Sequence, residues 1–448
     1  MPPTEVADPA TRPARLGAAH AAPAADHAPR PATYRCDVLV VGAGPSGSAA
    51  AYWLADAGYD VLLVEKKHFP REKTCGDGLT PRSVRQLQDI GLGPDLEHYH
   101  RYEGLRALAF GKELLLSWPE HPDFPPYGYV VTRADLDGLV AARAEKAGAA
   151  LWQGAEALSP LGPDAASGGP ALGAVVADRD LGGQTEVTAR YVVVADGANS
   201  RFGRALGASR DRSIPLGMAI RGYYASPRHA EPYIESHLDI RDANGAVVPG
   251  YGWIFPLGDG RVNVGVGVLS TFERWKQVNT TKLMDAFVGW APGSWCLSPE
   301  TALGPPTGGR LPMGLSVGPR VGPDYLMTGD AGGSVNPFNG EGIAYGYETG
   351  RFAAAALGEA LCTGDPAALA GYDTRLAEAY GLYFKLGSAF MKLMGRGDLM
   401  RLTVGTGMYS RSLMEWILRI MSNLVRDDEL GPAEAAYRAI AAIAKRAG

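Results

Sequence analysis

Two short segments of this sequence carry side chains that could act on an apolar molecule. The first runs from Lys73 to Pro81 and places one thiol, that of Cys75, in a glycine-rich loop. A thiol with a pKa of about 8.5 is mostly protonated at neutral pH, so Cys75 is a candidate catalytic proton donor. Small residues around it would let the loop approach a planar ring closely. The alternative, from composition alone, is a buried cysteine that only packs.

The second segment is a run of alternating aromatic residues. Tyr251, Trp253 and Phe255 are spaced at period two, and Pro256 ends the run. In a strand their rings would project from one face. A glycine-rich turn and another apolar run at residues 261–268 follow, so we predict a hairpin. Its aromatic face fits either an ordinary sheet core or a site for a large apolar substrate.

A dinucleotide-binding unit precedes both segments. Residues 36–41 form an expected strand, a glycine pattern and an alanine-rich helix follow, and a second expected strand at 61–64 ends in an acid. This order, at βαβ spacing, is typical of a Rossmann-type unit that holds a dinucleotide. A βαβ unit without a cofactor is the alternative. The residues expected to bind the nucleotide are Gly42, Gly44, Pro45, Gly47, Glu65 and Lys66.

Their chemistry explains these expectations. Gly42 permits the tight turn, and Gly44 lets the backbone approach the pyrophosphate at the helix N-terminus. Gly47 lets the helix pack closely on the strand. The Glu65 carboxylate can bind the ribose hydroxyls, and its charge disfavours the 2′-phosphate of NADP at this site.

Two later segments favour FAD over NAD. Strands expected at 192–194 and 325–327 both run into a pair of glycine and aspartate, and a glycine-rich helix start follows the second. With these segments in this order, the chain resembles FAD-dependent proteins of the p-hydroxybenzoate-hydroxylase-like fold group. The resemblance implies that Asp330 contacts the ribityl chain. It also implies that Gly342 and Ile343 lie under the flavin pyrimidine and the pyrophosphate.

The thiol loop and the aromatic run resemble motifs of the geranylgeranyl reductase family. Cys75-Gly76-Asp77-Gly78 is similar to its Cys-Gly-x-Gly loop, and residues 251–256 match its Tyr-x-Trp-x-Phe-Pro motif. The resemblance covers roughly residues 35–430. In three stretches the chain looks most like the menaquinone reductase branch: Lys73–Val84, Pro249–Ser270 and Gly329–Arg351.

The resemblance also implies roles for particular residues. Those expected beside the flavin are Cys75, Gly76, Gly78 and Arg133, with Ala157 near the adenine end. Those expected to line a tunnel for an isoprenoid chain are Tyr251, Trp253, Phe255 and Pro256. Hydride addition to an isolated alkene needs accompanying protonation, for which Cys75 is the candidate. Tyr251 and Trp253 are candidate catalytic residues that would stabilise cationic character by cation–π attraction.

We therefore expect an FAD-dependent reductase that saturates an isoprene double bond, and we favour the menaquinone side chain as its substrate. The alternatives are a reductase of geranylgeranyl diphosphate or geranylgeranyl lipids, an FAD-dependent aromatic monooxygenase, and, as a non-enzyme, a redox-inert flavin-binding module. No second dinucleotide fingerprint is evident. The expected electron source is therefore either NAD(P)H that docks transiently or a ferredoxin-type redox donor protein.

The predicted fold class is α/β: a p-hydroxybenzoate-hydroxylase-like FAD-binding fold with an inserted β-rich substrate domain and a helical C-terminal region. Composition agrees with a globular protein, at 448 residues and 46% hydrophobic residues. The net charge of −5 gives no support for nucleic-acid binding. Four cysteines without a Cys-x-x-Cys pair predict no metal site and fit a reducing compartment. The expected divisions are a disordered Ala/Pro-rich tail (1–33), an FAD-binding domain in two parts (34–209 and 316–365), a substrate domain (210–315) and the helical region (366–448).

One helix near the C-terminus is predicted to be amphipathic. It spans residues 412–426, with an apolar stripe made of Leu413, Ile417, Ile420, Met421 and Leu424. The stripe fits packing inside the protein or, as an alternative, contact with a bilayer. No run of 18 apolar residues predicts a membrane span. Because menaquinone resides in the membrane, we expect a cytoplasmic protein in peripheral contact with it.

Overall fold

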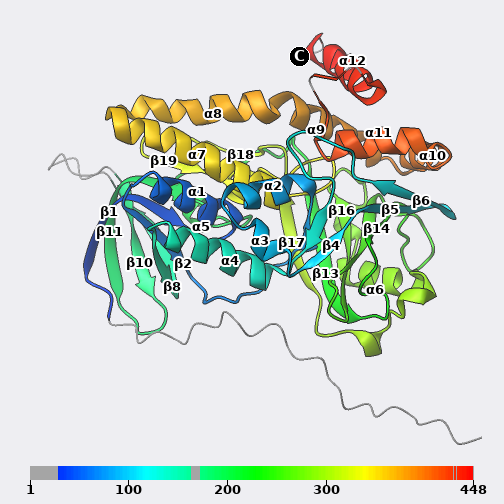
Figure 1. The fold of residues 1–448 in the computed structure, drawn as a ribbon, viewed down its shortest axis with the longest axis horizontal. Coiled ribbons are helices and arrows are strands. Elements are labelled where there is room, and N and C mark those ends of the chain that lie inside the picture. The colour runs from blue at the N-terminus through cyan, green and yellow to red at the C-terminus, as the bar shows by residue number, and fades with distance from the viewer. Residues whose placement is uncertain (1–28, 163–171, 427, 430, 447–448) are drawn as a thin grey trace, which may run out of the picture.

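The computed structural model describes residues 29–162, 172–426, 428–429 and 431–446 (Figure 1). The predicted tail, as far as residue 28, lies outside the described residues. Its last residues already belong to the folded chain. Arg30 forms an ion pair with Asp178 at 2.8 Å, and the first strand, β1, begins at Thr33 (Thr33–Val41).

The first of two large sheets contains the dinucleotide-binding unit. β1 lies between β2 (Val61–Glu65) and β11 (Gln184–Val194), and both pairings are parallel. The other strands are β8 (Ala150–Gln153), β9 (Ala155–Leu161), β10 (Leu172–Asp178) and β19 (Tyr325–Met327). β1 and β2 are runs of valine and leucine because both faces of a parallel sheet are covered.

Helices cover one face of this sheet, and apolar side chains of β1, β2, β10 and β11 form a second cluster on the other side. The helices are α1 (Pro45–Asp56), α4 (Arg133–Lys146) and α7 (Ile343–Thr363). Their side chains share one apolar core with Val38 and Val40, whereas Leu39 and Val41 face Ala174 and Val176 of β10. The expected α/β class is confirmed.

The second large sheet is antiparallel at its centre and carries the aromatic run. Its order is β17 (Thr307–Pro312), β13 (Leu216–Ala225), β16 (Arg261–Leu269), β15 (Gly250–Pro256), β14 (Tyr233–His237), β5 (Gly104–Ala109) and β6 (Lys112–Ser117). The predicted hairpin is confirmed as β15 and β16. α6 (Thr280–Trp290) packs on one face through Phe287 and Met284. The strands β5 and β6 come from within 34–209, so this sheet is larger than the predicted substrate domain.

Short elements link the two sheets. Three of them are helices: α2 (Pro81–Asp89), α3 (Gly93–Leu96) and α5 (Arg201–Ala205). A three-stranded sheet has the order β3 (Gly78–Leu79), β7 (Gly128–Val130) and β4 (His100–Tyr102). A two-stranded sheet pairs β12 (Ser209–Arg210) with β18 (Val317–Gly318). α2 begins at Pro81, and the hydroxyl of the preceding Thr80 accepts a hydrogen bond from the Ser83 N–H.

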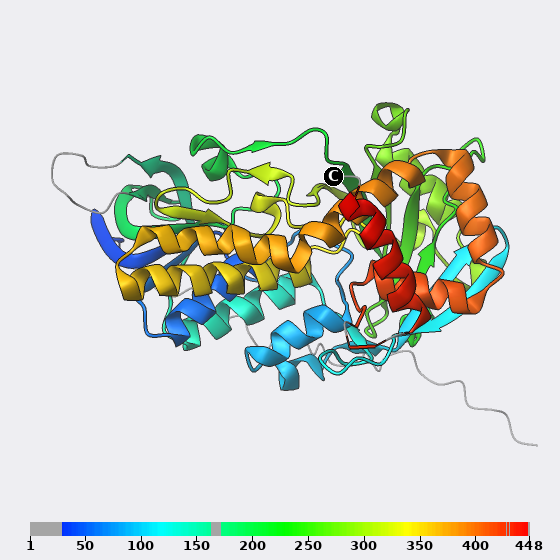
Figure 2. The ribbon, with the colours of Figure 1, turned by 90° about the horizontal axis from the view of Figure 1, so that it is seen from above.

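The C-terminal region is helical, with α8 (Ala370–Leu376), α9 (Leu382–Met394), α10 (Gly397–Gly407), α11 (Arg411–Met421) and α12 (Pro432–Arg446). α8 lies along α7, and α10 and α11 lie at the end that holds β5 and β6 (Figures 1 and 2). None of the helices in the described segments combines the length and apolar character that crossing a membrane requires.

The amphipathic helix differs from its prediction. α11 ends at Met421 rather than Arg426, because Asn423 takes a left-handed conformation (φ 54°) that ends a helix. Its buried residues are Met414 and Leu418, whereas Leu413 of the predicted stripe is exposed.

Candidate functional site

The glycines after β1 form a cradle at the N-terminus of α1. Gly42 has φ +100°, and a Cβ on Gly47 would lie 1.8 Å from the Gly42 carbonyl oxygen, so neither position accepts a side chain. Gly44 differs, because the nearest atom to a Cβ there would be a nitrogen of Arg71 at 3.9 Å. Gly44 is also the N-cap of α1, has no side-chain cap, and is followed by Pro45. The open face of Gly44 and the uncapped helix fit a pyrophosphate.

Glu65 stands at the end of β2, next to this cradle. Its carboxylate accepts hydrogen bonds from the Ala43 N–H (3.2 Å) and the Lys67 N–H (3.1 Å), and it pairs with Arg71 at 3.2 Å. Lys66 is exposed. The backbone bonds hold the carboxylate beside the first glycine turn, where a ribose would lie.

Ion pairs connect Glu65 to Arg133. Arg71, which the sequence did not single out, also pairs with Asp137 at 2.9 Å. Asp137 in turn accepts two hydrogen bonds from Arg133, at 2.7 and 2.6 Å. Arg133 is the first residue of α4 and is buried. Four alternating charges thus join the ribose end of the cradle to the loop that contains Cys75, because the Arg133 N–H donates to the carboxylate of Asp77 in that loop at 3.3 Å.

The second cofactor segment converges on the start of α7. A Cβ on Gly342 would lie 3.4 Å from Oδ1 of Asp330, and Ile343 is buried directly after it. Gly342 is the N-cap of α7 and has no side-chain cap. Ala157 lies on β9, paired with Val176. The chain just before β9 meets the Glu65 region, where the Gly154 N–H donates to the Lys67 carbonyl, and Ala157 is three residues further along.

The thiol loop lies against the aromatic run. A Cβ on Gly76 would lie 3.1 Å from the Phe255 ring and 3.4 Å from Nε1 of Trp253, and one on Gly78 would lie 3.0 Å from Phe255. The three rings share one face, with centroids 5.8 Å apart for Tyr251 and Trp253 and 6.2 Å for Trp253 and Phe255. The folded chain therefore brings the two segments together, and glycine is what allows the contact. Pro256 ends β15 and pairs with Val262.

Asn263 joins the loop to the aromatic run. Its Oδ1 accepts a hydrogen bond from Nε1–H of Trp253 at 2.9 Å. Its Nδ2 donates to the carbonyl of Cys75 (2.9 Å) and to the carboxylate of Asp77 (2.8 Å). The side chain is fully buried. The sequence analysis did not single out Asn263; the signal was a single amide within the apolar run of β16.

Asp77 belongs to the same network, although the sequence analysis assigned it no role beyond a position in the Cys-Gly-x-Gly loop. It has φ +65° and is fully buried, and it accepts hydrogen bonds from the Tyr223 hydroxyl (2.5 Å) and the Arg133 N–H (3.3 Å) as well as from Asn263. Burial raises the pKa of Asp77 to about 6, against the opposing effects of Tyr223 and Arg221. Burial also raises the pKa of the Cys75 thiol. The thiol thus stays protonated at neutral pH, and the neighbouring Asp77 carboxyl has a pKa of about 6.

Replacing Asn263 with leucine is expected to destabilise the protein by about 2–4 kcal/mol, because it leaves the Trp253 N–H buried without a partner. Urea unfolding of the flavin-free protein would measure this change. The control is Asn244→Leu, in an exposed turn, for which we expect about 0.5 kcal/mol or less. Equal effects of the two substitutions would contradict the role given to Asn263.

Glu341 lies between the aromatic run and α2. Its Oε1 accepts hydrogen bonds from the hydroxyls of Thr80 and Ser83, while its Oε2 is buried without a partner. Burial raises the pKa of Glu341 to about 7. Tyr251 donates to the carbonyl of neighbouring Asn339 at 2.9 Å, and burial raises its pKa to about 12.

Glu341→Gln is expected to stabilise the flavin-free protein more at pH 8 than at pH 4.5. The difference between the two stabilisations should be about 2 kcal/mol. The folded-state pKa of Glu341 is raised above its ordinary value of 4.5. The wild-type protein therefore loses stability as the pH rises from 4.5 through 7, and glutamine removes that loss. Urea unfolding at both pH values is the measurement. An equal gain at both, or a gain matched by the exposed control Glu378→Gln, would contradict the prediction.

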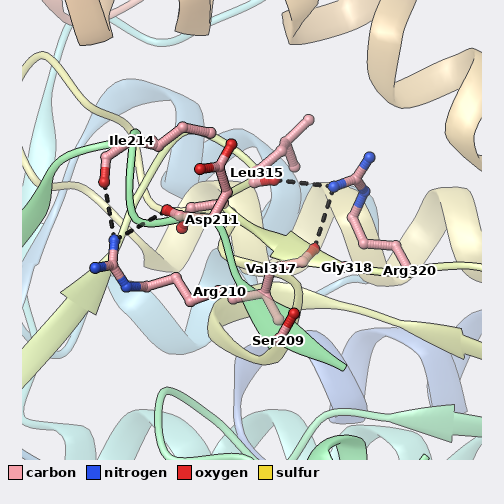
Figure 3. Close-up of a pocket in the computed structure, with 9 residues that line it drawn as sticks. Ser209, Arg210, Asp211, Ile214, Leu315, Val317, Gly318 and Arg320 are labelled. Carbon is pink, nitrogen blue, oxygen red and sulfur yellow. Dashed lines mark hydrogen bonds between the residues drawn. The ribbon is translucent and has the colours of Figure 1, made fainter. Parts of the chain in front are cut away.

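A separate cavity of about 350 Å³ lies beside the β12–β18 pair (Figure 3). The guanidinium groups of two arginines in its wall donate hydrogen bonds to backbone carbonyls. Arg210 donates to Ile214 at 2.8 Å, and Arg320 donates to Leu315 at 2.9 Å. None of the predicted site residues lines this cavity, so it is not part of the site described above.

Known proteins show the same combination of segments. A family model described as FAD binding domain matches residues 35–219. A menaquinone reductase of Mycobacterium tuberculosis is 42% identical over 393 residues, which cover 88% of this chain and 92% of the relative. A digeranylgeranylglycerophospholipid reductase of Methanosphaera stadtmanae is 31% identical, over 73% of this chain and 79% of the relative.

A solved structure shares the fold. It is a geranylgeranyl bacteriochlorophyll reductase-like protein of Thermoplasma acidophilum, with a TM-score of 0.72 and 23% identity, over 87% of this chain and 96% of that one. The sequence relatives, the FAD-binding model and the cradle agree with one another. This chain therefore belongs to the geranylgeranyl reductase family of FAD-dependent oxidoreductases that act on prenyl groups, and within it to the branch of the menaquinone reductases.

Proposed function

We propose that this enzyme saturates one isoprene double bond in the side chain of menaquinone. The observation that carries the proposal is the contact between the Cys75 loop and the aromatic run, in a chain 42% identical to a menaquinone reductase. A polyprenyl chain offers only methyl and alkene groups. A thiol in a loop that lies against an aromatic face is therefore the kind of surface that can both bind and protonate it.

The chain's own residues have distinct roles in this proposal. Cys75 gives its proton to the less substituted alkene carbon, so the S–H bond breaks and a C–H bond forms. The tertiary carbon becomes electron-poor as this happens, and Tyr251 and Trp253 stabilise it by cation–π attraction of about 1–2 kcal/mol when water is excluded. Phe255 and Pro256 line the channel. Asp77 and the side chains hydrogen-bonded to it, Tyr223 and Asn263, then provide a route for returning a proton to the thiolate.

The cofactor site is proposed on the cradle described above. When bound, reduced FAD supplies the hydride that completes the addition. The proposed contacts to its nucleotide half are Gly42, Gly44, Pro45, Gly47, Glu65, Lys66 and Ala157. Those to its flavin half are Cys75, Gly76, Gly78, Arg133, Asp330, Gly342 and Ile343.

The proposal includes an electron source and a location. Electrons come from NAD(P)H or from a ferredoxin-type donor, and the protein works on the cytoplasmic side in peripheral contact with the membrane. In this proposal the chain divides into an FAD-binding domain, a substrate sheet and a helical C-terminal region, and the alkene binds between the first two.

Mass spectrometry of the lipid products tests the proposal. The flavin of the purified protein is reduced without oxygen, and menaquinone or geranylgeranyl diphosphate is added in separate reactions. A gain of two hydrogens in the menaquinone side chain is the expected result. A gain only in the diphosphate would overturn the choice of substrate, and no gain in either, with oxygen alone reoxidising the flavin, would overturn the reductase mechanism.

A further inference from the structure

An exposed apolar surface lies at the end of the molecule formed by α10 and α11. Leu402 on α10 is 66% exposed, Tyr409 between the helices is 77% exposed, and Leu413 on α11 is 38% exposed. The three residues lie within one helical hairpin, at the end where β5 and β6 also lie (Figures 1 and 2). Ile417 and Ile420 of α11 are only half-buried. We define Leu402, Tyr409 and Leu413 as the hairpin surface.

Basic residues border the hairpin surface. Between residues 392 and 419 the chain has five basic residues and two acidic ones, whereas the whole chain has a net charge of −5. Two of the five are in ion pairs, Arg411 with Glu415 and Arg419 with Glu429 and Glu434. Arg401 and Arg411 are exposed next to the surface, and Nζ of Lys112 lies 4.5 Å from the centroid of the Tyr409 ring. Exposed leucine and tyrosine bordered by basic side chains are what an anionic lipid surface attracts.

The same helices are connected to the aromatic run through the interior. Met408 and Met414 are buried directly behind the hairpin surface, and they belong to one apolar cluster with Leu116 and Phe255. The apolar cluster therefore extends from the helices of the hairpin surface to the ring that contacts the thiol loop. Methionine side chains are flexible, so this part of the cluster can adapt its packing to an apolar ligand.

We propose that the hairpin surface is where this enzyme docks on an anionic lipid bilayer. Leu402, Tyr409 and Leu413 enter the interface, and Arg401, Arg411 and Lys112 contact lipid phosphates. The inference rests on the proposed function for the identity of the substrate, but the docking itself does not. The face of the protein formed by α10 and α11 thus turns toward the membrane, next to the apolar cluster that includes Phe255.

Sedimentation with vesicles tests the docking surface in the full-length, FAD-loaded protein. Vesicles of phosphatidylglycerol and phosphatidylcholine are compared with vesicles of phosphatidylcholine alone. We expect binding to the anionic vesicles that weakens with salt, and that falls by about tenfold or more in the triple variant Leu402→Glu, Tyr409→Glu and Leu413→Glu. The matched control is Leu181→Glu, which is 56% exposed on the turn after β10 and should bind like the wild type.

Two further measurements keep the outcomes distinct. Flavin content and circular dichroism should be the same in the triple variant and the wild type. The double variant Arg401→Glu and Arg411→Glu is a second test of vesicle binding that removes no apolar residue. Reduction of menaquinone dispersed in detergent should be unchanged in the triple variant. Vesicle binding that survives both sets of substitutions would overturn the docking surface, as would self-association that the triple variant abolishes without any vesicle binding. Failure of the wild type to reduce detergent-dispersed menaquinone would instead overturn the proposed function.

Discussion

Cys75→Ala is expected to lower the rate of prenyl reduction by about a hundredfold or more, while FAD stays bound. Removing the thiol removes the proton donor at the alkene, and an isolated alkene accepts a hydride poorly without protonation. The cofactor should remain, because the backbone of the loop is held through the Cys75 carbonyl by Asn263 (2.9 Å) and Arg221 (3.2 Å), not through the side chain. Single-turnover oxidation of the reduced enzyme by substrate, followed by absorbance, measures the rate.

Two control variants make this result specific. Cys362→Ala removes an exposed thiol on α7 and should leave the rate unchanged. Cys75→Ser keeps the size of the side chain but replaces the thiol with a much weaker acid, so it should resemble Cys75→Ala. If Cys75→Ser keeps the full rate, the proton comes from another group, and Asp77 becomes the first residue to examine because its pKa is raised to about 6.

Gly44→Ala is expected to weaken FAD binding by roughly a hundredfold, about 3 kcal/mol, without destabilising the flavin-free protein. Inside the protein a Cβ at this position meets nothing nearer than 3.9 Å, and the backbone is in an ordinary region with φ −82°. The added methyl group would instead occupy the space above the N-terminus of α1. It would push the pyrophosphate away from the N–H groups that bind it.

Two further glycine variants separate an effect on FAD binding from an effect on folding. Gly47→Ala should destabilise the flavin-free protein, because its Cβ would overlap the Gly42 carbonyl at 1.8 Å. Gly289→Ala, in α6 with open space around it, should leave FAD affinity unchanged and should not destabilise the protein. Fluorescence titration with FAD and urea unfolding of each variant are the measurements. Unchanged FAD affinity in Gly44→Ala would mean that the pyrophosphate does not lie on this face of the cradle.

Much of the fold was predictable because it depends on neighbouring residues. The glycine turn between β1 and α1 needs a positive φ at Gly42, and the start of α2 needs Thr80 and Pro81. Alternation fixed the faces of β15, since side chains two residues apart always point the same way. The resemblance to a known family supplied the cofactor and the reaction, and the comparisons confirm both.

Contacts between distant segments were harder to predict. Nothing in the spacing of β5 and β6 indicates that they extend the sheet of β15, because the order of strands depends on which faces are buried once the chain has folded. The end of α11 was missed for a local reason, the left-handed Asn423. Its buried face was missed because Met414 and Leu418, not Leu413, turn toward the core.

The candidate site shows the same division. By itself the sequence determined which chemical groups are present: a thiol between small residues, an aromatic stripe and a glycine cradle. Only the tertiary structure decided that the Cys75 loop lies on Trp253 and Phe255 and that Asn263 and Asp77 hold the two together. The physical reason is that local sequence sets backbone geometry and the direction of side chains. A buried hydrogen-bond network forms only where separate segments exclude water together.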